Sequence, residues 1–548
     1  MSPASIDGVV LLGASAAGLA LIARRQLRDE PRWVGATLVG IVLLGIGLRL
    51  ALSLNAPMNA WAYSRVLWLS DAIARGFVFP AFAPPEGVAL VDLFSYTNLA
   101  AAALTPLAYF VHARYLFGQR ESALAAALMI AVLPHHIRFS ASDVQFIVSL
   151  LSSSLTFIAI YAALIERDRL FAYPAIVLAP LLALGTYYTR PENILFVVVD
   201  LAALLLYARN AVSRQRLVLV AGLTLAAGGL AFYHHILPKF GGTLHGAVGT
   251  QTLIWAFQIA TSPRENTLIN PSMMPTVVPV LAAAGAWLLL RQRAWLKLVL
   301  LGGWLGAFFV AESSVRPPSL AMMARYHLHL VTPFVLFAAA AAPALFAARS
   351  RWMVAAALAW LIAAPWLHKS FIQDVGYSEM REFAFLRTVT DQIQPHCEVV
   401  EFTPEVATSS RPTSKWRRLG TRATAGGLDE TIVVVPMSEA DATGTESVTT
   451  TALTRLSDPA ACTYVYLGLT CVGSRDPERE AESPVCTTMR ATLAANPRAA
   501  LVASHDTTAR YYDDPHSGRI VMEASGHTRV QRTIQDGDPL RFELWLVR

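Results

Sequence analysis

The sequence predicts a polytopic α-helical membrane protein of about twelve transmembrane helices, followed by a C-terminal extracytoplasmic domain of α/β or α+β type. Three observations favour this fold class. The 548 residues are 55% hydrophobic and 15% charged, with a mean hydropathy of +0.46, which excludes a typical soluble protein. Apolar stretches fill the first 367 residues. Arginine and lysine gather in alternate gaps between these stretches, as they do in the cytoplasmic loops of membrane proteins.

Each apolar stretch is a candidate membrane span, since about 20 helical residues cross the hydrocarbon core. Backbone groups in lipid must be satisfied internally, so we expect helices. The expected spans are 8–23, 33–54, 97–113, 122–134, 145–165, 171–188, 193–208, 217–236, 275–290, 297–311, 327–347 and 352–367.

The basic gaps set the expected topology. They hold sixteen arginines and lysines in all, at Arg24–Arg32, Arg114–Arg120, Arg167–Arg169, Arg209–Arg216, Arg291–Lys297 and Arg349–Arg351. We therefore expect these gaps in the cytoplasm and the intervening gaps outside. The first stretch has its positive charge behind it rather than before it, so we interpret it as an N-out helix and not as a secretory signal. The net charge of +6 then indicates anionic membrane lipids, and not nucleic acid, as partners.

Two domains follow from the composition. Residues 1–367 form a membrane domain with large outward loops at 55–96 and 237–274, and residues 368–548 form a soluble extracytoplasmic domain. Short β-rich segments and helical patterns alternate in the second domain. The expected strands are Cys397–Phe402, Thr431–Pro436, Cys462–Leu467, Arg519–Glu523 and Phe542–Val547, and the expected helices are Tyr377–Gln394 and Pro484–Ala495.

All four cysteines, Cys397, Cys462, Cys471 and Cys486, lie in the second domain. An even count in an extracytoplasmic domain predicts two disulfides, and the absence of a C-x-x-C spacing makes zinc the weaker interpretation. A Cys471–Cys486 bond would close a short loop, a constraint worth roughly 3 kcal/mol. Cys397–Cys462 would be its complement, although three pairings remain open.

Four outward segments carry the polar residues of the membrane part. They are the first loop with Asn59, Tyr63 and Asp92, the segment Pro134–Asp143, the segment Thr189–Asn193, and the segment Arg316–His329. Ionisable groups at a membrane boundary are costly and usually face a cavity or a partner. We therefore expect a shared polar cavity, lined by Arg138, Asp143, Arg190, Glu192 and Arg325.

Simpler roles remain open for the same residues. Arg190 and Glu192 fit a helix-end pair around Pro191. Arg138 and Arg325 could snorkel, with the aliphatic stem in the bilayer and the guanidinium at the interface. Asp143 could cap the next helix. Adjacent histidines on a helix point about 100° apart, which makes His135–His136 a poor metal site. No cofactor is predicted, and a divalent metal stays an open alternative.

Three of these segments resemble a known family. Leu133–Ser140, followed by Asp143, is similar to the P-H-x-R-x-S turn of GT-C glycosyltransferases, specifically the lipid-linked sugar transferases related to protein O-mannosyltransferases. Thr189–Glu192 resembles their T-R-P-E motif, and Arg325–Pro333 resembles their R-Y-x-x-x-x-x-P motif. The resemblance covers roughly residues 33–367, including the large first outward loop, and implies a GT-C-like fold.

The resemblance implies transfer of a hexosyl or pentosyl unit from a polyprenyl-phosphate donor to a glycan, lipid or protein acceptor outside the cytoplasm. Asp143 or Asp92 would be the base of an inverting attack. The implied substrate-binding residues are Asn59, Tyr63, His136, Arg138, Arg190, Glu192, Arg325 and His327, with the arginines holding phosphate. One departure is Asn59-Ala60, where the family has an acid. Either Asp92 replaces that acid, or Asp143 acts alone, or the chain is not a working transferase.

The alternative function is a catalytically degenerate membrane scaffold or a lipid-linked glycan transporter. A transporter would favour ionisable residues near the bilayer midplane, whereas here they gather at the outer boundary, with Asp200 as the exception. This distribution favours the enzyme. The absence of an N-x-S/T sequon favours a bacterial inner membrane, with the C-terminal domain periplasmic or extracellular.

Overall fold

The computed structural model describes two compact units, which divide near residue 374. In the helical unit the described residues are 17–53 (except 29), 90–140, 146–189, 191–235, 270–313, 327–347, 351–369 and 372. In the carboxyl-terminal unit they are parts of 382–403, then 432–436, 462–468, 471, 484–508 and 539–548.

All described secondary-structure elements of the first unit are helices. They are α2 (Arg32–Leu48) with the π-helical turn η1 (Arg49–Ser53), α4 (Leu90–Phe117), α5 (Arg120–Val132), α6 (Pro134–Phe139), α7 (Phe146–Ile165), α8 (Arg169–Thr189), the 3₁₀ turn η4 (Pro191–Leu195), α9 (Phe196–Ala208), α10 (Arg214–His235), α14 (Val277–Arg291), α15 (Trp295–Ser313), α17 (Leu328–Ala347) and α18 (Arg351–Leu367). Residues 17–26 are helical as well. Every one of the twelve expected spans therefore contains a helix.

Five helices in the described residues are long and apolar enough to cross a membrane, namely Arg32–Ser53, Phe146–Ile165, Arg169–Thr189, Arg214–Tyr233 and Leu328–Ala347. Four further apolar helices are shorter. Large hydrophobic side chains such as Val177, Val218, Trp287, Val310 and Trp352 are exposed on these helices, where lipid would cover them. The helices thus support a polytopic membrane protein, while the number of twelve crossings stays a prediction.

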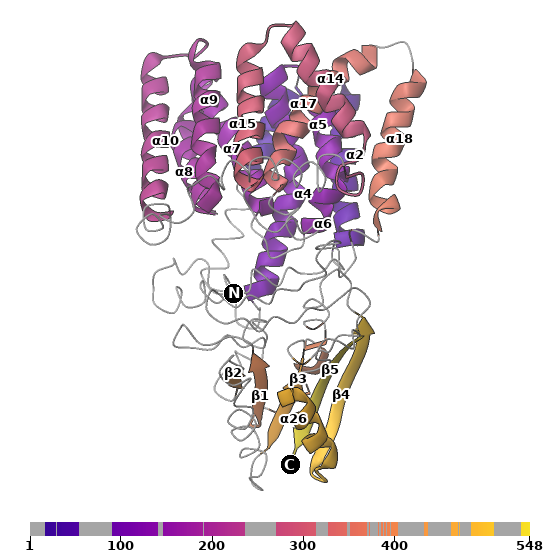
Figure 1. Cartoon of the computed structure of the whole chain (residues 1–548). Coiled ribbons are helices and arrows are strands. Elements are labelled where there is room, and N and C mark those ends of the chain that lie inside the picture. Colours follow the sequence, from indigo (N-terminus) through magenta and orange to yellow (C-terminus); the bar gives the residue numbers. More distant parts are fainter. Residues whose placement is uncertain are drawn as a thin grey trace, which may run out of the picture. The chain divides into compact units, whose positions relative to one another are not determined.

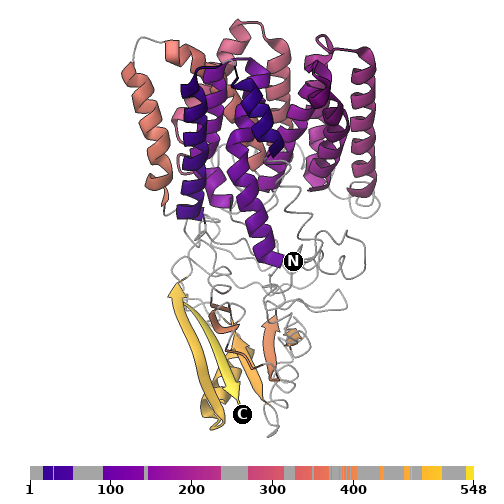
Figure 2. The ribbon, with the colours of Figure 1, turned by 180° about the vertical axis from the view of Figure 1, so that it is seen from behind.

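The helices pack into a bundle with a buried centre (Figures 1 and 2). α7 packs on α8, α14 packs on α17, and α5 packs on both α2 and α17. Both views show α8, α9 and α10 together on one side of the helical unit and α18 on the opposite side. The centre is consequently formed by α4, α5, α7 and α17, and most side chains of α7 and α17 are buried.

Two boundaries differ from the sequence expectations. The first outward loop was expected to reach residue 96, but α4 begins at Leu90, so Asp92 lies in a helix and not in that loop. The segment Pro134–Asp143 was expected to be an outward loop, but Pro134–Phe139 is the buried helix α6. Proline is favourable in the first turn of a helix because its missing N–H needs no partner there.

The second unit is built on a mixed five-stranded sheet of order β2-β1-β3-β5-β4. Its strands are β1 (Glu398–Thr403), β2 (Ile432–Pro436), β3 (Thr463–Leu467), β4 (Ala499–Thr508) and β5 (Pro539–Val547). β1 runs parallel to β2 and β3, while β5 runs antiparallel to β3 and β4. Helix α26 (Pro484–Ala495) contributes Met489 and Leu493 to the core on one face of the sheet.

Four of the expected strands and the helix Pro484–Ala495 are confirmed, with shifts of at most a few residues. The expected strand Arg519–Glu523 lies outside the described residues. β4 was not expected, because its polar residues give no apolar alternation. As an edge strand it buries little of either face, so the sequence carries no such signal.

Both expected disulfides are present. Cys397 is bonded to Cys462, and Cys471 is bonded to Cys486. The first bond joins the starts of the parallel neighbours β1 and β3, and the second joins Cys471 to α26. Cys471 and Cys486 are both buried in the core of the sheet, so this bond contributes to packing as well as to chain connectivity.

Candidate functional site

Helix α6 carries the first of the three motif segments. Leu133 is extended, Pro134 starts the helix, and all six residues of α6 are buried. The backbone N–H of His135 donates to Met273 O at 3.2 Å, and the Ser140 hydroxyl donates to His136 O at 2.7 Å. A short helix with two adjacent histidines is thus held rigidly inside the bundle. The Arg138 side chain is buried as well, at 5% exposed.

Arg49, at the end of α2, makes the most extensive polar contacts near α6. Its side chain is 1% exposed. Nη1 donates to Gly45 O at 2.7 Å and to Ala131 O at 3.0 Å, and Nη2 donates to Ile130 O at 3.2 Å. Ile130 and Ala131 lie in the last turn of α5, where carbonyls lack helical partners and the helix dipole is negative. The guanidinium therefore caps α5.

The same guanidinium reaches the histidine of the motif. Arg49 Nη2 lies 2.5 Å from His136 Nδ1. Arginine can only donate hydrogen bonds, so Nδ1 accepts, and the proton of a neutral His136 is on Nε2. A Cβ at Gly45 would lie 3.1 Å from Arg49 Nη1 and 3.2 Å from Ala131 Cβ, so α2 and α5 pack tightly at this glycine.

Arg49 was not singled out from the sequence. The signal was present, because Arg49 is the only charged residue of the expected span 33–54. Charged residues in such positions face the bundle interior and mark functional or structural centres.

Each of the three motifs is followed by a helix, and the first turns of these three helices meet at the ring of His329. Its ring stacks on Phe308 with centroids 4.5 Å apart, and meets Phe146 at 5.2 Å and Phe196 at 5.6 Å. Phe146 opens α7, Phe196 opens α9, and His329 lies in the first turn of α17. In the sequence they follow Asp143, Glu192 and Arg325 by three or four residues.

Two further contacts join the motif segments. His327, next to the start of α17, lies close enough to His135 of α6 for an electrostatic interaction. Asn193, in the turn η4, donates to Ser149 Oγ of α7 at 2.9 Å and to Thr186 O of α8 at 2.7 Å. Five buried side chains belong to these helix ends, and we call them the buried basic cluster: Arg49, His135, His136, Arg138 and His327.

The basic gaps lie at the opposite ends of these helices. Arg114 and Arg120 both contact Glu30, at 2.6 and 3.1 Å, and Arg25 contacts Glu166 at 3.0 Å. Two further contacts link these gaps. Arg216 donates a hydrogen bond to Glu166 O, and the Lys297 ammonium lies over the ring of Phe117. α5 runs from Arg120 to Val132, about 20 Å at 1.5 Å per residue, so this length separates the basic gaps from the Arg49 contacts.

The remaining candidate residues are placed only in part. Asp143, Arg190, Arg325, Asn59 and Tyr63 lie outside the described residues. The backbone of Asp92 lies in α4 and that of Glu192 in η4, but their side chains are outside the described set. The roles expected for these seven residues therefore stay predictions.

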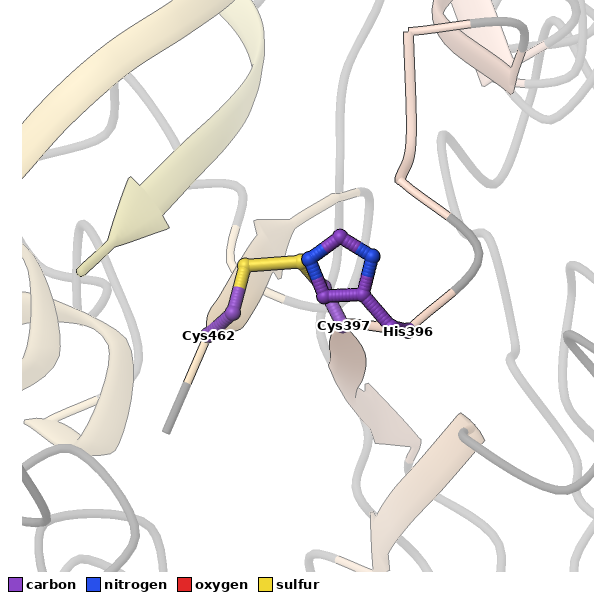
Figure 3. A group of neighbouring side chains, drawn as sticks. All are labelled: His396, Cys397 and Cys462. Atoms are coloured by element: carbon purple, nitrogen blue, oxygen red, sulfur yellow. A yellow bond between two sulfur atoms is a disulfide. The ribbon is translucent and has the colours of Figure 1, made fainter. Parts of the chain in front are cut away.

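One group of side chains in the described residues has the spacing of a metal site. It consists of His396, Cys397 and Cys462, whose potential ligand atoms all lie within 4.8 Å of one another. Figure 3 shows the His396 imidazole beside the bond between the two sulfurs. With both sulfurs in a disulfide, neither is a thiolate, and thiolate is the form that binds metals. This group is therefore not suited to hold a metal in its oxidised form.

Comparison with known proteins finds similarity among solved structures alone. No family model matches the chain, and no curated protein matches it. Among solved structures, the oligosaccharyltransferase of Archaeoglobus fulgidus, crystallised with Zn and sulfate, is similar at 14% identity and a TM-score of 0.38. The match covers 67% of this chain and 60% of that chain, so this chain accounts for about three-fifths of that enzyme's length. The proposals below rest on this chain's own residues.

Proposed function

We propose that this chain is an integral membrane glycosyltransferase that moves a sugar from a polyprenyl-phosphate donor to an extracytoplasmic acceptor. The acceptor is a glycan, a lipid or a protein. The buried basic cluster is the observation that carries the proposal. It lies at the helix ends opposite the basic gaps, and it contains residues of two of the three motif segments that resemble GT-C glycosyltransferases.

The chemistry needs a base and a stabilised leaving group. The acceptor hydroxyl attacks the anomeric carbon while the bond from that carbon to the phosphate oxygen breaks, and the hydroxyl proton passes to a carboxylate. Asp143 is the base in this proposal, and Asp92 is its substitute. The negative charge that develops on the polyprenyl phosphate is stabilised by cations, for which we assign Arg138, Arg190 and Arg325.

A transporter or scaffold is the alternative. Asp200, the acid inside a span, is the sequence feature that favours a transporter, but its carboxylate accepts a hydrogen bond from Tyr187 at 2.6 Å. This pair gives Asp200 a structural role within the bundle and weakens the transporter alternative. The departure at Asn59-Ala60 favours a scaffold and is addressed by the activity measurement below.

Substitution of Asp143 in membranes tests the proposal. We expect Asp143→Asn to reduce sugar transfer at least 100-fold, in line with the loss of a general base. The matched control is Asp168→Asn, since Asp168 lies among the basic gaps and contacts Arg25 at 3.7 Å, and it should transfer sugar normally. Unchanged transfer by Asp143→Asn would remove Asp143 from the mechanism and leave Asp92 as the base to be tested next.

The proposed sidedness can be tested separately with reporter fusions. A green fluorescent protein fused after Ser213, between α9 and α10, should fluoresce, because it would lie in the cytoplasm. Alkaline phosphatase fused after Arg548 should be active, because it folds only outside the cytoplasm. The reverse pattern would place the buried basic cluster near the cytoplasmic face, where the proposed reaction does not belong.

A further inference from the structure

The contacts of Arg49 leave one hydrogen-bond donor of its partner unused. Because Arg49 donates to His136 Nδ1 at 2.5 Å, the imidazole carries its proton on Nε2. Among the described residues, Nε2 of His136 has no hydrogen-bond partner, and His136 is fully buried. More than nine in ten buried polar groups in proteins are paired, so an unpaired N–H at this position indicates a missing acceptor.

Arg49 has an unused donor too. Its Nη1 and Nη2 atoms make four hydrogen bonds, while its Nε is buried and lacks a partner in the described part of the chain. Within that part no carboxylate forms an ion pair with Arg49, and its acceptors are carbonyls and an imidazole. A buried guanidinium that is balanced only by carbonyl dipoles retains attraction for an anion.

We propose that Arg49 is a positioning residue, which holds His136 as a fixed Nε2–H donor for an oxygen of the donor lipid's phosphate. The phosphate ligand rests on the function proposed above, whereas the positioning of His136 does not. His136 is fixed from both sides in this account, because Arg49 orients its ring and Ser140 binds its carbonyl at 2.7 Å. A pre-oriented donor binds the developing phosphate charge without reorganisation.

The tautomer of His136 is the first measurement. In protein labelled with ¹⁵N-histidine and held in phosphatidylcholine nanodiscs, the His136 signal is identified by its loss in His136→Gln. We expect a single neutral Nε2–H form in the wild type and in Arg49→Lys, because lysine also only donates. In Arg49→Met we expect a mixture of tautomers. A charged imidazolium or an Nδ1–H form in the wild type, or no change in Arg49→Met, would overturn the positioning role.

Titration with undecaprenyl phosphate is the second measurement. We expect its addition to shift the Nε2 signal of the wild type, and its dissociation constant to rise at least tenfold in Arg49→Met. Arg209→Met, which removes an exposed arginine at the other end of α9, should bind like the wild type. A shift produced equally by inorganic phosphate would assign the site to free phosphate and overturn the lipid assignment. No shift with either probe would overturn the ligand altogether.

These outcomes separate the inference from the proposed function. Lipid-dependent shifts in a protein that transfers no sugar would leave the phosphate site in place and contradict the glycosyltransferase. Sugar transfer that is unaffected in both Arg49→Met and His136→Gln would contradict the inference and leave the glycosyltransferase standing.

Discussion

The hydroxyl of Tyr187 on α8 donates a hydrogen bond of 2.6 Å to the carboxylate of Asp200 on α9, and both side chains are buried. Asp200 is the one acid that the sequence places inside an apolar span, so this pair accounts for a residue that otherwise suggests a transport site. It joins two neighbouring helices on one side of the bundle.

Removing the Tyr187 hydroxyl should therefore destabilise the helical unit. Tyr187→Phe leaves a buried carboxyl group without its donor, which costs about 1–3 kcal/mol. Unfolding of the full chain in mixed detergent micelles measures this difference. Tyr173→Phe is the control on the same helix, because Tyr173 is exposed, and its effect should stay within about 0.5 kcal/mol. Equal effects of the two substitutions would show that the bond to Asp200 adds nothing.

The helices were largely predictable from the sequence, because the bilayer requires long apolar stretches and the charge rule separates them. The edge strand β4 was missed since its exposed polar residues do not need to alternate. The contacts of Arg49 were missed for another reason. Its partners Ile130, Ala131 and His136 lie more than 80 residues away, and no local pattern links a span to the end of a later helix.

For the candidate site, the sequence predicted a shared polar cavity. This stays a prediction, because Asp143, Arg190 and Arg325 lie outside the described residues. The starts of the helices that follow the motif segments do meet in the ring cluster around His329. The sequence did not predict that α6 is a buried helix, because the doublet His135-His136 and Arg138 make this segment look like a polar loop. Inside the bundle, the His136 ring has Arg49 as a partner, and the backbone N–H of His135 has the Met273 carbonyl.

Helices α14 and α17 pack tightly against each other at Gly285. A Cβ at this position would lie 1.8 Å from Phe337 O, so Gly285→Ala must push the helices apart. We expect the free energy of unfolding to fall by about 1–3 kcal/mol, measured as a lower thermal midpoint of the purified protein. Gly302→Ala, where a Cβ would meet nothing within 4 Å, should instead be neutral or stabilising by up to about 1 kcal/mol. A tolerated Gly285→Ala would contradict the packing of these two helices.

The two disulfides should differ in their contributions to stability. Cys397–Cys462 spans 65 residues and Cys471–Cys486 spans 15. In the chain-entropy model these loops are worth about 4 and about 3 kcal/mol. Paired replacement by alanine, followed by denaturation of the full chain with hydrogen exchange at β3 and β5 as the readout, measures both. A larger loss from the shorter loop would indicate that the buried packing of Cys471 and Cys486 outweighs chain entropy.

Tyr466 of β3 should make the sheet sensitive to alkali. Its hydroxyl donates to Glu382 Oε1 at 2.9 Å, and burial, together with the nearby charges of Glu382 and Glu401, raises the pKa of Tyr466 well above its ordinary value of 10.0. A raised pKa in the folded state means that the stabilisation is complete below pH 10 and is lost as the pH rises beyond it.

We therefore expect the hydrogen-exchange protection of β3 to fall above pH 10 in the wild type. This alkaline loss should be smaller in Tyr466→Phe, which has no phenolic proton to lose. Tyr464→Phe, which removes a hydroxyl that binds the Gln392 carbonyl at 3.0 Å, should keep the alkaline loss of the wild type. Identical pH profiles of all three proteins would contradict the assignment to Tyr466.

The central claim is that this chain transfers a sugar from a polyprenyl-phosphate carrier. The measurement that tests it most directly is mass spectrometry of the lipids and envelope glycans from cells with and without the chain. We expect cells without it to accumulate one polyprenyl-phosphate sugar and to lack the same sugar from one glycan, lipid or protein. Unchanged pools of both would contradict the glycosyltransferase, and Asn59-Ala60 would then mark a scaffold that has lost its active site.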